Sequence, residues 1–142
     1  MHKILMIICG ITLISVLARA EDGSASSAVK DICEEKAGIL IQGNDGTYYC
    51  QSRGKMNWWT ALGWCQKLGL KLISYPQECN CEGSTCPVGT KNCLNLTGVG
   101  SGTVWTSAPN GNERAYWVQL SNGYISGSDP RNIATFQSAL CK

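Results

Sequence analysis

Residues 56–74 read MNWWTALGWCQKLGLKLIS, and this stretch predicts the helix around which the chain is organised. Asn57 suits the position before a helix, because its side-chain oxygen can accept a hydrogen bond from an unpaired amide of the first turn. Apolar residues then recur at spacings of three and four, the period of one helix face, namely Trp58, Leu62 and Cys65. Gly69 favours a left-handed end to this helix, and residues 70–73 predict a short buried strand.

The first twenty of the 142 residues predict a secretory signal peptide. Lys3 precedes an apolar run at residues 4–17, and Ala18-Arg19-Ala20 has the small-x-small pattern of a cleavage site. The apolar run is shorter than the roughly 20 residues that span a bilayer; a retained membrane anchor is the alternative. We therefore expect cleavage after residues 1–20 and a secreted, extracellular product (periplasmic or at the cell surface in a bacterium) without a membrane span.

Loss of the signal peptide would also remove several kinds of chemistry. The remaining chain has 10 basic and 10 acidic residues, because Lys3 and Arg19 leave with the signal. No basic stripe runs along the sequence, so we expect no nucleic-acid partner. The only histidine, His2, is lost as well, which excludes Ser-His and Cys-His nucleophilic pairs and histidine metal ligands from the mature chain.

An even number of cysteines in a small exported domain predicts a disulfide framework. The eight that remain are Cys33, Cys50, Cys65, Cys79, Cys81, Cys86, Cys93 and Cys141. A bond between Cys33 and Cys50 would close the hairpin that they flank. The four cysteines of residues 79–93 can pair among themselves in three ways, and we favour Cys81–Cys86 inside Cys79–Cys93. A four-thiolate zinc site is the alternative interpretation, but the Cys-x-Cys spacing is too short for a zinc knuckle.

The rest of the chain predicts strands and loops with a loose N-terminal arm. Residues 21–32 are polar and rich in small side chains, and we expect an arm there, with a short helical turn over residues 29–36 as an option. Two β-rich runs around Asn44-Asp45-Gly46 predict a hairpin. Residues 75–102 lack periodicity and predict a cysteine-tied loop. Further strands are expected at residues 104–106, 115–120, 124–125 and 135–141, with Asn122-Gly123 as a two-residue turn. Together these elements predict one α+β domain over residues 33–142.

Several of these features together resemble a C-type lectin-like domain. The matching residues at its start are Tyr48-Tyr49-Cys50, Lys55-Met56-Asn57-Trp58, Ala61, Cys65, Leu68-Gly69 and Leu72-Ile73. Later residues are similar to short bacterial domains of the same fold, namely Trp105-Thr106-Ser107, residues 115–123 and Leu140-Cys141. The resemblance covers residues 33–142 and implies a compact, microbial-type C-type lectin-like fold. It also implies a disulfide between Cys65 and Cys141, and the Cys33–Cys50 hairpin of the family's longer form.

The sequence departs from the sugar-binding members of that family where they hold calcium. Ala108-Pro109-Asn110 stands where those members have Glu-Pro-Asn or Gln-Pro-Asp, and no Trp-Asn-Asp follows. Calcium prefers roughly six to eight oxygen ligands, carboxylates among them, and Glu113 is the only acid nearby. We therefore expect no bound calcium, no other metal and no cofactor.

The segment Ser107 to Arg114 (SAPNGNER) is the ligand loop that the sequence favours, because its short polar side chains can hydrogen-bond a sugar or a peptide. An ordinary solvated turn is the alternative interpretation. Exposed tryptophans can stack on sugar rings or anchor a partner, whereas Trp58 and Trp105 are expected in the core. The predicted site residues are Asn110, Asn112, Glu113, Arg114, Trp59 and Trp64.

These features predict a secreted, non-enzymatic binding module that recognises a glycan or a surface protein without calcium. The alternative is a structural or protein-interaction component of a cell-surface assembly with no carbohydrate site. Glycoside hydrolysis by paired carboxylates would have to draw on loop residues without a supporting pattern, namely Glu78, Glu82, Glu113 and Asp129. We therefore expect no enzymatic activity. Asn95-Leu96-Thr97 is a glycosylation sequon that would matter only in a eukaryotic secretory pathway.

Overall fold

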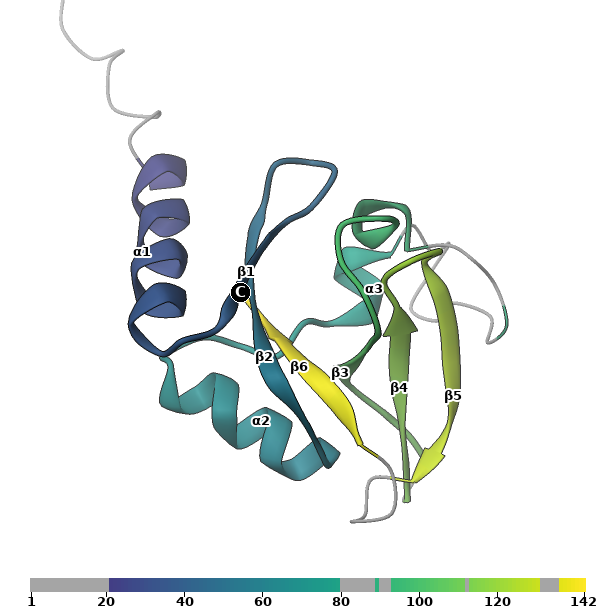
Figure 1. Ribbon diagram of the computed structural model, residues 1–142. Helices are drawn as coiled ribbons and strands as arrows, with labels where there is room; N and C mark the ends of the chain where they lie inside the picture. The colour runs from purple at the N-terminus through teal and green to yellow at the C-terminus, as the bar shows by residue number, and fades with distance from the viewer. Residues whose placement is uncertain (1–20, 80–88, 90–92, 112, 131–135) are drawn as a thin grey trace, which may run out of the picture.

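Six strands pair in the order β1-β2-β6-β3-β4-β5 to form one mixed sheet (Figure 1). They are β1 (Ile39–Gln42), β2 (Tyr48–Met56), β3 (Thr103–Asn110), β4 (Arg114–Gln119), β5 (Tyr124–Pro130) and β6 (Gln137–Cys141). The helices are α1 (Glu21–Glu35), α2 (Trp58–Lys67) and the short α3 (Tyr75–Glu78), with a 3-10 turn at Leu94–Leu96. The computed structural model describes residues 21–79, 89, 93–111, 113–130 and 136–142. The expected α+β class is confirmed.

Helix α2 begins and ends where the sequence predicts. The Asn57 side chain accepts a hydrogen bond from the Thr60 amide (2.8 Å) and so satisfies one of the donors that a helix start leaves unpaired. At the other end Gly69 has a φ of 71°, a left-handed conformation that glycine adopts without steric cost. The face that carries Trp58 and Cys65 is buried against the sheet, as the spacing predicts.

Successive residues of the central strands enter two separate cores, because neighbouring side chains of a strand point to opposite faces of the sheet. On β6, Leu140 enters one core and Cys141 the other, and on β3 Val104 and Trp105 divide in the same way. The α2-side core contains Trp58, Ala61, Cys65, Leu68, Leu72 and Trp105, among others. The loop-side core contains Tyr49, Ile73, Tyr75, Leu96, Val104 and Val118, among others.

Three disulfides connect peripheral elements to each other or to the sheet. Cys33–Cys50 connects α1 to β2, Cys65–Cys141 connects α2 to β6, and Cys79–Cys93 connects the end of α3 to the 3-10 turn. These are the pairings anticipated for those six residues, whereas Cys81 and Cys86 lie outside the described part of the chain, as does the expected signal peptide. No helix among the described residues is long and apolar enough to cross a membrane. Disulfides of this kind fit an oxidising, extracellular environment.

Helix α1 corrects the expectation of a loose arm at residues 21–32. It runs over 15 residues, Glu21–Glu35, because Val29, Ile32 and Cys33 lie three and four residues apart and pack together on the α2-side core. The helix is also covalently joined to the sheet through Cys33. The small polar residues before Val29 masked this apolar stripe in the sequence.

The segment at residues 70–73 is not a strand of the sheet, contrary to expectation. Leu72 makes only an isolated antiparallel bridge to Cys141, and the Ile73 amide donates to the Leu140 carbonyl (2.9 Å). β6 pairs with β2 along one side and with β3 near Ser138 on the other. Only the end of that second side is left for residues 70–73, so the pairing is too short to form a strand.

The turn at Asn122-Gly123 is longer than the two residues expected. Pairing between β4 and β5 ends at Gln119 and Tyr124, so four residues connect the strands. Gly123 has a φ of 69°, and a Cβ at this position would lie 2.8 Å from the carbonyl oxygen of Cys93. Glycine is therefore needed here both for the backbone conformation and for the close approach of the disulfide-linked loop.

A buried carboxylate, Glu78, joins distant parts of the chain. The Tyr49 hydroxyl donates to Glu78 Oε2 (2.5 Å), and Lys142 Nζ faces Glu78 Oε1 as an ion pair without hydrogen-bond geometry. Asn95 Nδ2 donates to the Tyr49 hydroxyl (2.8 Å), and the Asp45 amide donates to Asn95 Oδ1 (2.8 Å). The amide side chain of the sequon is therefore part of the internal hydrogen-bond network that holds the first hairpin to the cysteine-rich segment.

Removal of the Cys65–Cys141 disulfide is expected to cost more stability than removal of Cys33–Cys50. The two bonds close sequence separations of 76 and 17 residues, for which loop-closure entropy gives about 4 and about 3 kcal/mol. Paired Cys→Ala variants, compared by urea unfolding under oxidising conditions, would measure both free energies. An equal or reversed ranking would contradict this entropic account.

The free energy of unfolding is expected to fall at alkaline pH because of Tyr49. Burial, and then the neighbouring Glu78 carboxylate, raise the pKa of Tyr49 well above its ordinary value. Above about pH 10 the unfolded chain releases this proton and the folded chain keeps it, so stability falls by up to about 1.4 kcal/mol per pH unit. Urea unfolding across this range would show a shallower slope for Tyr49→Phe. A slope identical to that of the wild-type chain would contradict the assignment.

Candidate functional site

The site residues expected from the sequence lie on two separate elements, the β3–β4 hairpin and helix α2. Asn110 and Arg114 are register partners at the end of the hairpin, where Glu113 and Arg114 are exposed. Asn112 lies outside the described residues. Neither of the two cavities described below is lined by these hairpin residues.

The two tryptophans expected to bind a ligand do not form one surface. Trp59 and Trp64 are five residues apart on α2, which separates them by about 140° around the helix axis. Trp64 is partly buried against the α2-side core, whereas 60% of Trp59 is exposed. Trp59 packs edge-on against Trp58, with ring centroids 4.7 Å apart. Trp58 is itself buried, and its indole N–H donates to the Thr106 carbonyl (2.7 Å), so an exposed aromatic ring rests on a fixed one.

A cavity of about 740 Å³ opens beside α2 and is here called the α2 cavity. Leu62, Leu70 and Leu72 supply its apolar lining. Its polar lining residues are Gln66, Lys71, Ser74, Gln77, Ser107 and Lys142. Ligand pockets of roughly 300–1,000 Å³ that combine apolar walls with a few polar groups are typical of small-molecule sites.

Three parts of the fold position the α2 cavity. Leu62 and Gln66 follow Trp59 by three and seven residues, so all three lie on one face of α2. Opposite them, the backbones of Lys71 and Lys142 exchange two hydrogen bonds (2.8 and 3.0 Å). The third wall comes from β3, where the Ser107 amide donates to the Ile73 carbonyl (2.7 Å). One wall of the cavity is therefore a helix face, and backbone hydrogen bonds hold the other two walls.

Most polar side chains of the α2 cavity are not used by the fold. Within the described part of the chain, the side chains of Gln66, Gln77 and Ser107 make no hydrogen bond, and Lys71 makes no ion pair. Ser74 precedes α3, but its side chain does not cap that helix. Lys142 differs, because its ammonium group is held by Glu78. Donors and acceptors thus remain free for a ligand.

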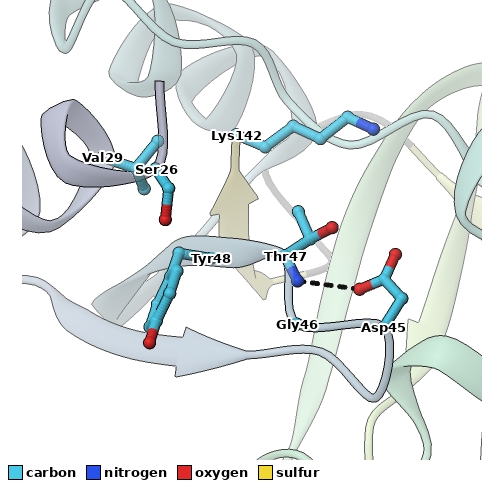
Figure 2. Close-up of a pocket in the computed structure, with 7 residues that line it drawn as sticks. All are labelled: Ser26, Val29, Asp45, Gly46, Thr47, Tyr48 and Lys142. Carbon is cyan, nitrogen blue, oxygen red and sulfur yellow. Dashed lines mark hydrogen bonds between the residues drawn. The ribbon is translucent and has the colours of Figure 1, made fainter. Parts of the chain in front are cut away.

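Lys142 also borders a second cavity of about 550 Å³, between α1 and the β1–β2 turn (Figure 2). Its two charged lining residues, Asp45 and Lys142, already have partners within the fold. The Thr47 amide donates to Asp45 Oδ1 (2.9 Å), and Lys30 Nζ lies 4.0 Å from the centre of the Tyr48 ring. Burial works against ionisation of Asp45, but hydrogen bonds from Thr47, with smaller contributions from Asn95 and the Asp45 backbone, together outweigh it and lower the pKa of this carboxyl. The charged groups of this cavity are therefore engaged within the fold, whereas Lys71 in the α2 cavity makes no ion pair with a described residue.

Metal ligands do not gather in the described ranges of the chain, which contain no cluster of three or more His, Cys, Asp or Glu side chains. The six cysteines described there are all in disulfides. Ala108, at the position that the resemblance assigns to the first calcium ligand, packs against the loop-side core. It presents no oxygen atom from its side chain.

Comparison with known proteins gives no match to any family model and none among curated proteins. The resemblance to C-type lectin-like domains therefore depends on the residues of this chain alone. Sequence reasoning missed the α2 cavity, and its expectation that Trp59 contacts a ligand stays a prediction. The spacing of Trp59, Leu62 and Gln66 was a usable signal, whereas residues 71, 74, 77 and 107 meet only in the folded chain.

Replacement of the two neighbouring tryptophans by alanine is expected to have very different effects on stability. Trp58→Ala removes a buried ring and a buried hydrogen bond, and we expect a loss of about 3–5 kcal/mol. Trp59→Ala removes a mostly exposed ring, and we expect a loss below about 1 kcal/mol. Urea unfolding of the two variants would measure both values. A large loss for Trp59→Ala would show that this ring is structural and not available to a ligand.

Proposed function

We propose that this protein is a secreted, non-enzymatic, lectin-like module that binds a glycan in the α2 cavity without calcium. The observation that carries the proposal is the combination of an apolar lining with polar side chains that the fold leaves unused. Saccharides present hydroxyl groups around an apolar ring face, so a site of this composition is complementary to them.

The exposed ring of Trp59 supports a glycan over a small apolar ligand. Aromatic faces provide large contact area at a low cost in conformational entropy. Because Trp59 lies on the same helix face as Leu62 and Gln66, a chain of sugars can contact the ring and the cavity together. The packing of Trp59 on Trp58 holds the ring in place before a ligand arrives.

The disulfide pattern supports the C-type lectin-like part of the proposal. Cys65–Cys141 joins the main helix to the last strand, and Cys33–Cys50 joins an N-terminal element to the first hairpin. Both are the bonds that the family resemblance implies. The packing of Ala108 into the loop-side core favours a site that differs from the family's calcium loop.

The buried carboxylate of Glu78 is bound by other side chains of the fold, which favours a role without catalysis. Glu78 is buried, but its carboxylate is taken up by the Tyr49 hydroxyl and the Lys142 ammonium group. A general acid or base needs a carboxyl group that can reach a substrate. Glu78 instead serves to hold the fold together.

Binding to a glycan array is expected to be the same in calcium and in EDTA. In the Trp59→Ala variant, affinity for the best array ligand should fall at least tenfold, which corresponds to about 1.4 kcal/mol of lost contact energy. Lys67→Ala is the matched control, because Lys67 is exposed on the same helix and does not line the cavity.

Isothermal titration of the oxidised protein, residues 21–142, would measure these affinities. Loss of binding in EDTA would contradict the calcium-free mode. Equal losses in Trp59→Ala and Lys67→Ala would contradict the placement of the site. A blank array, together with capture of a protein ligand, would favour the protein-interaction alternative.

A further inference from the structure

We infer that the glycan bound in the α2 cavity carries an acetamido group, which the apolar lining and two glutamines recognise. The inference rests on the proposed function and specifies its ligand. It follows from which side chains the cavity presents, since a plain hydroxylated sugar would leave part of this lining unused.

An acetamido group combines a methyl group with an amide that both donates and accepts hydrogen bonds. Each glutamine side chain also both donates and accepts. Gln66 and Gln77 line the cavity from different elements, α2 and α3, and neither side chain makes a hydrogen bond within the described residues. Two such groups can bond the N–H and the C=O of one acetamido group, so the pair suits an amide better than a single hydroxyl.

The leucines supply a place for the methyl group. Leu62, Leu70 and Leu72 line the cavity, and Leu72 is buried while the other two are partly exposed. Burial of a methyl-sized group against such a surface is favourable, whereas a hydroxyl placed there would lose its water without gaining a partner. The same surface therefore favours an acetylated sugar and disfavours its hydroxyl counterpart.

A ligand longer than one sugar ring can contact Trp59 while it occupies the part of the cavity near Gln66. Trp59 and Gln66 are seven residues apart, or about 10 Å along the helix axis. A single ring in the cavity near Gln66 would leave Trp59 exposed. An oligosaccharide can place one acetamido group in the cavity and stack a neighbouring ring on Trp59, with Ser74 and Ser107 free to bond its hydroxyl groups.

A matched pair of trisaccharides tests this inference. Chitotriose and cellotriose have the same linkage and ring stereochemistry, and differ in carrying acetamido or hydroxyl groups at the 2-position. We expect chitotriose to bind about tenfold or more tightly, a discrimination typical of a pocket that matches one extra apolar and hydrogen-bonding group. Isothermal titration of the oxidised protein with both sugars would measure the ratio.

Variants separate recognition of the acetamido group from general binding. Gln66→Met and Gln77→Met keep the side-chain length but remove the amide, and should lower chitotriose affinity severalfold and cellotriose affinity by a clearly smaller factor. Trp59→Ala should weaken both sugars by the same factor, and Lys67→Ala should change neither. Both glutamines are exposed, and circular dichroism would verify that each variant folds.

Equal affinity for the two trisaccharides would overturn the acetamido inference, and Trp59-dependent binding of both would leave the proposed function intact. No change in chitotriose affinity in either glutamine variant would also overturn it, because recognition would then lie elsewhere. Failure of both sugars, with a blank glycan array, would instead overturn the proposed function itself.

Discussion

A carboxylate taken out of water must be paired, and the Glu78 side chain, only 4% exposed, imposes this requirement on the whole fold. Its partners come from distant places, Tyr49 on β2 and Lys142 after β6. Glu78 is therefore paired only when the first hairpin, helix α3 and the end of the chain have all assembled. The Lys142 backbone also exchanges hydrogen bonds with Lys71. The ion pair with Glu78 therefore helps to position the Lys71–Lys142 wall of the α2 cavity.

The disulfides solve a related problem, which is how few apolar contacts each helix can make in so small a domain. Cys33–Cys50 holds α1 to the sheet and Cys65–Cys141 holds α2 to it. A helix that is joined to the sheet by a disulfide can stay in place even where its side chains do not pack tightly against the sheet. Both cavities lie beside such a helix, one lined by α1 residues and the other by α2 residues. The covalent bonds thus permit hollows that apolar packing alone would tend to fill.

Local signals in the sequence were sufficient for α2, the first hairpin and the C-terminal strands, because caps, turns and periodicity act over a few residues. They failed where the outcome depended on a distant partner. Helix α1 is stabilised by the sheet and by Cys50, and residues 70–73 are limited by what β6 already pairs with. The candidate site shows the same division, since the helix period alone places Trp59, Leu62 and Gln66 on one face of α2. Ser107 comes from β3, far from α2 in the sequence, and its amide donates to the Ile73 carbonyl beside the cavity.

The α2 cavity is a better candidate for the binding site than the end of the β3–β4 hairpin, because the fold already orders the side chains around it. A side chain that binds a ligand loses rotamer freedom, and a flexible backbone adds a further entropic cost to that loss. Gln66 and Leu62 stand on a capped helix that is covalently joined to β6. Trp59 rests on a tryptophan whose own N–H is bonded to β3. Glu113 lies in the turn before β4 and Arg114 begins that strand; both are exposed, and neither lines one of the two cavities. Binding energy is best realised where the fold has already ordered the contacting groups, and in this protein that is the face of α2 beside the cavity.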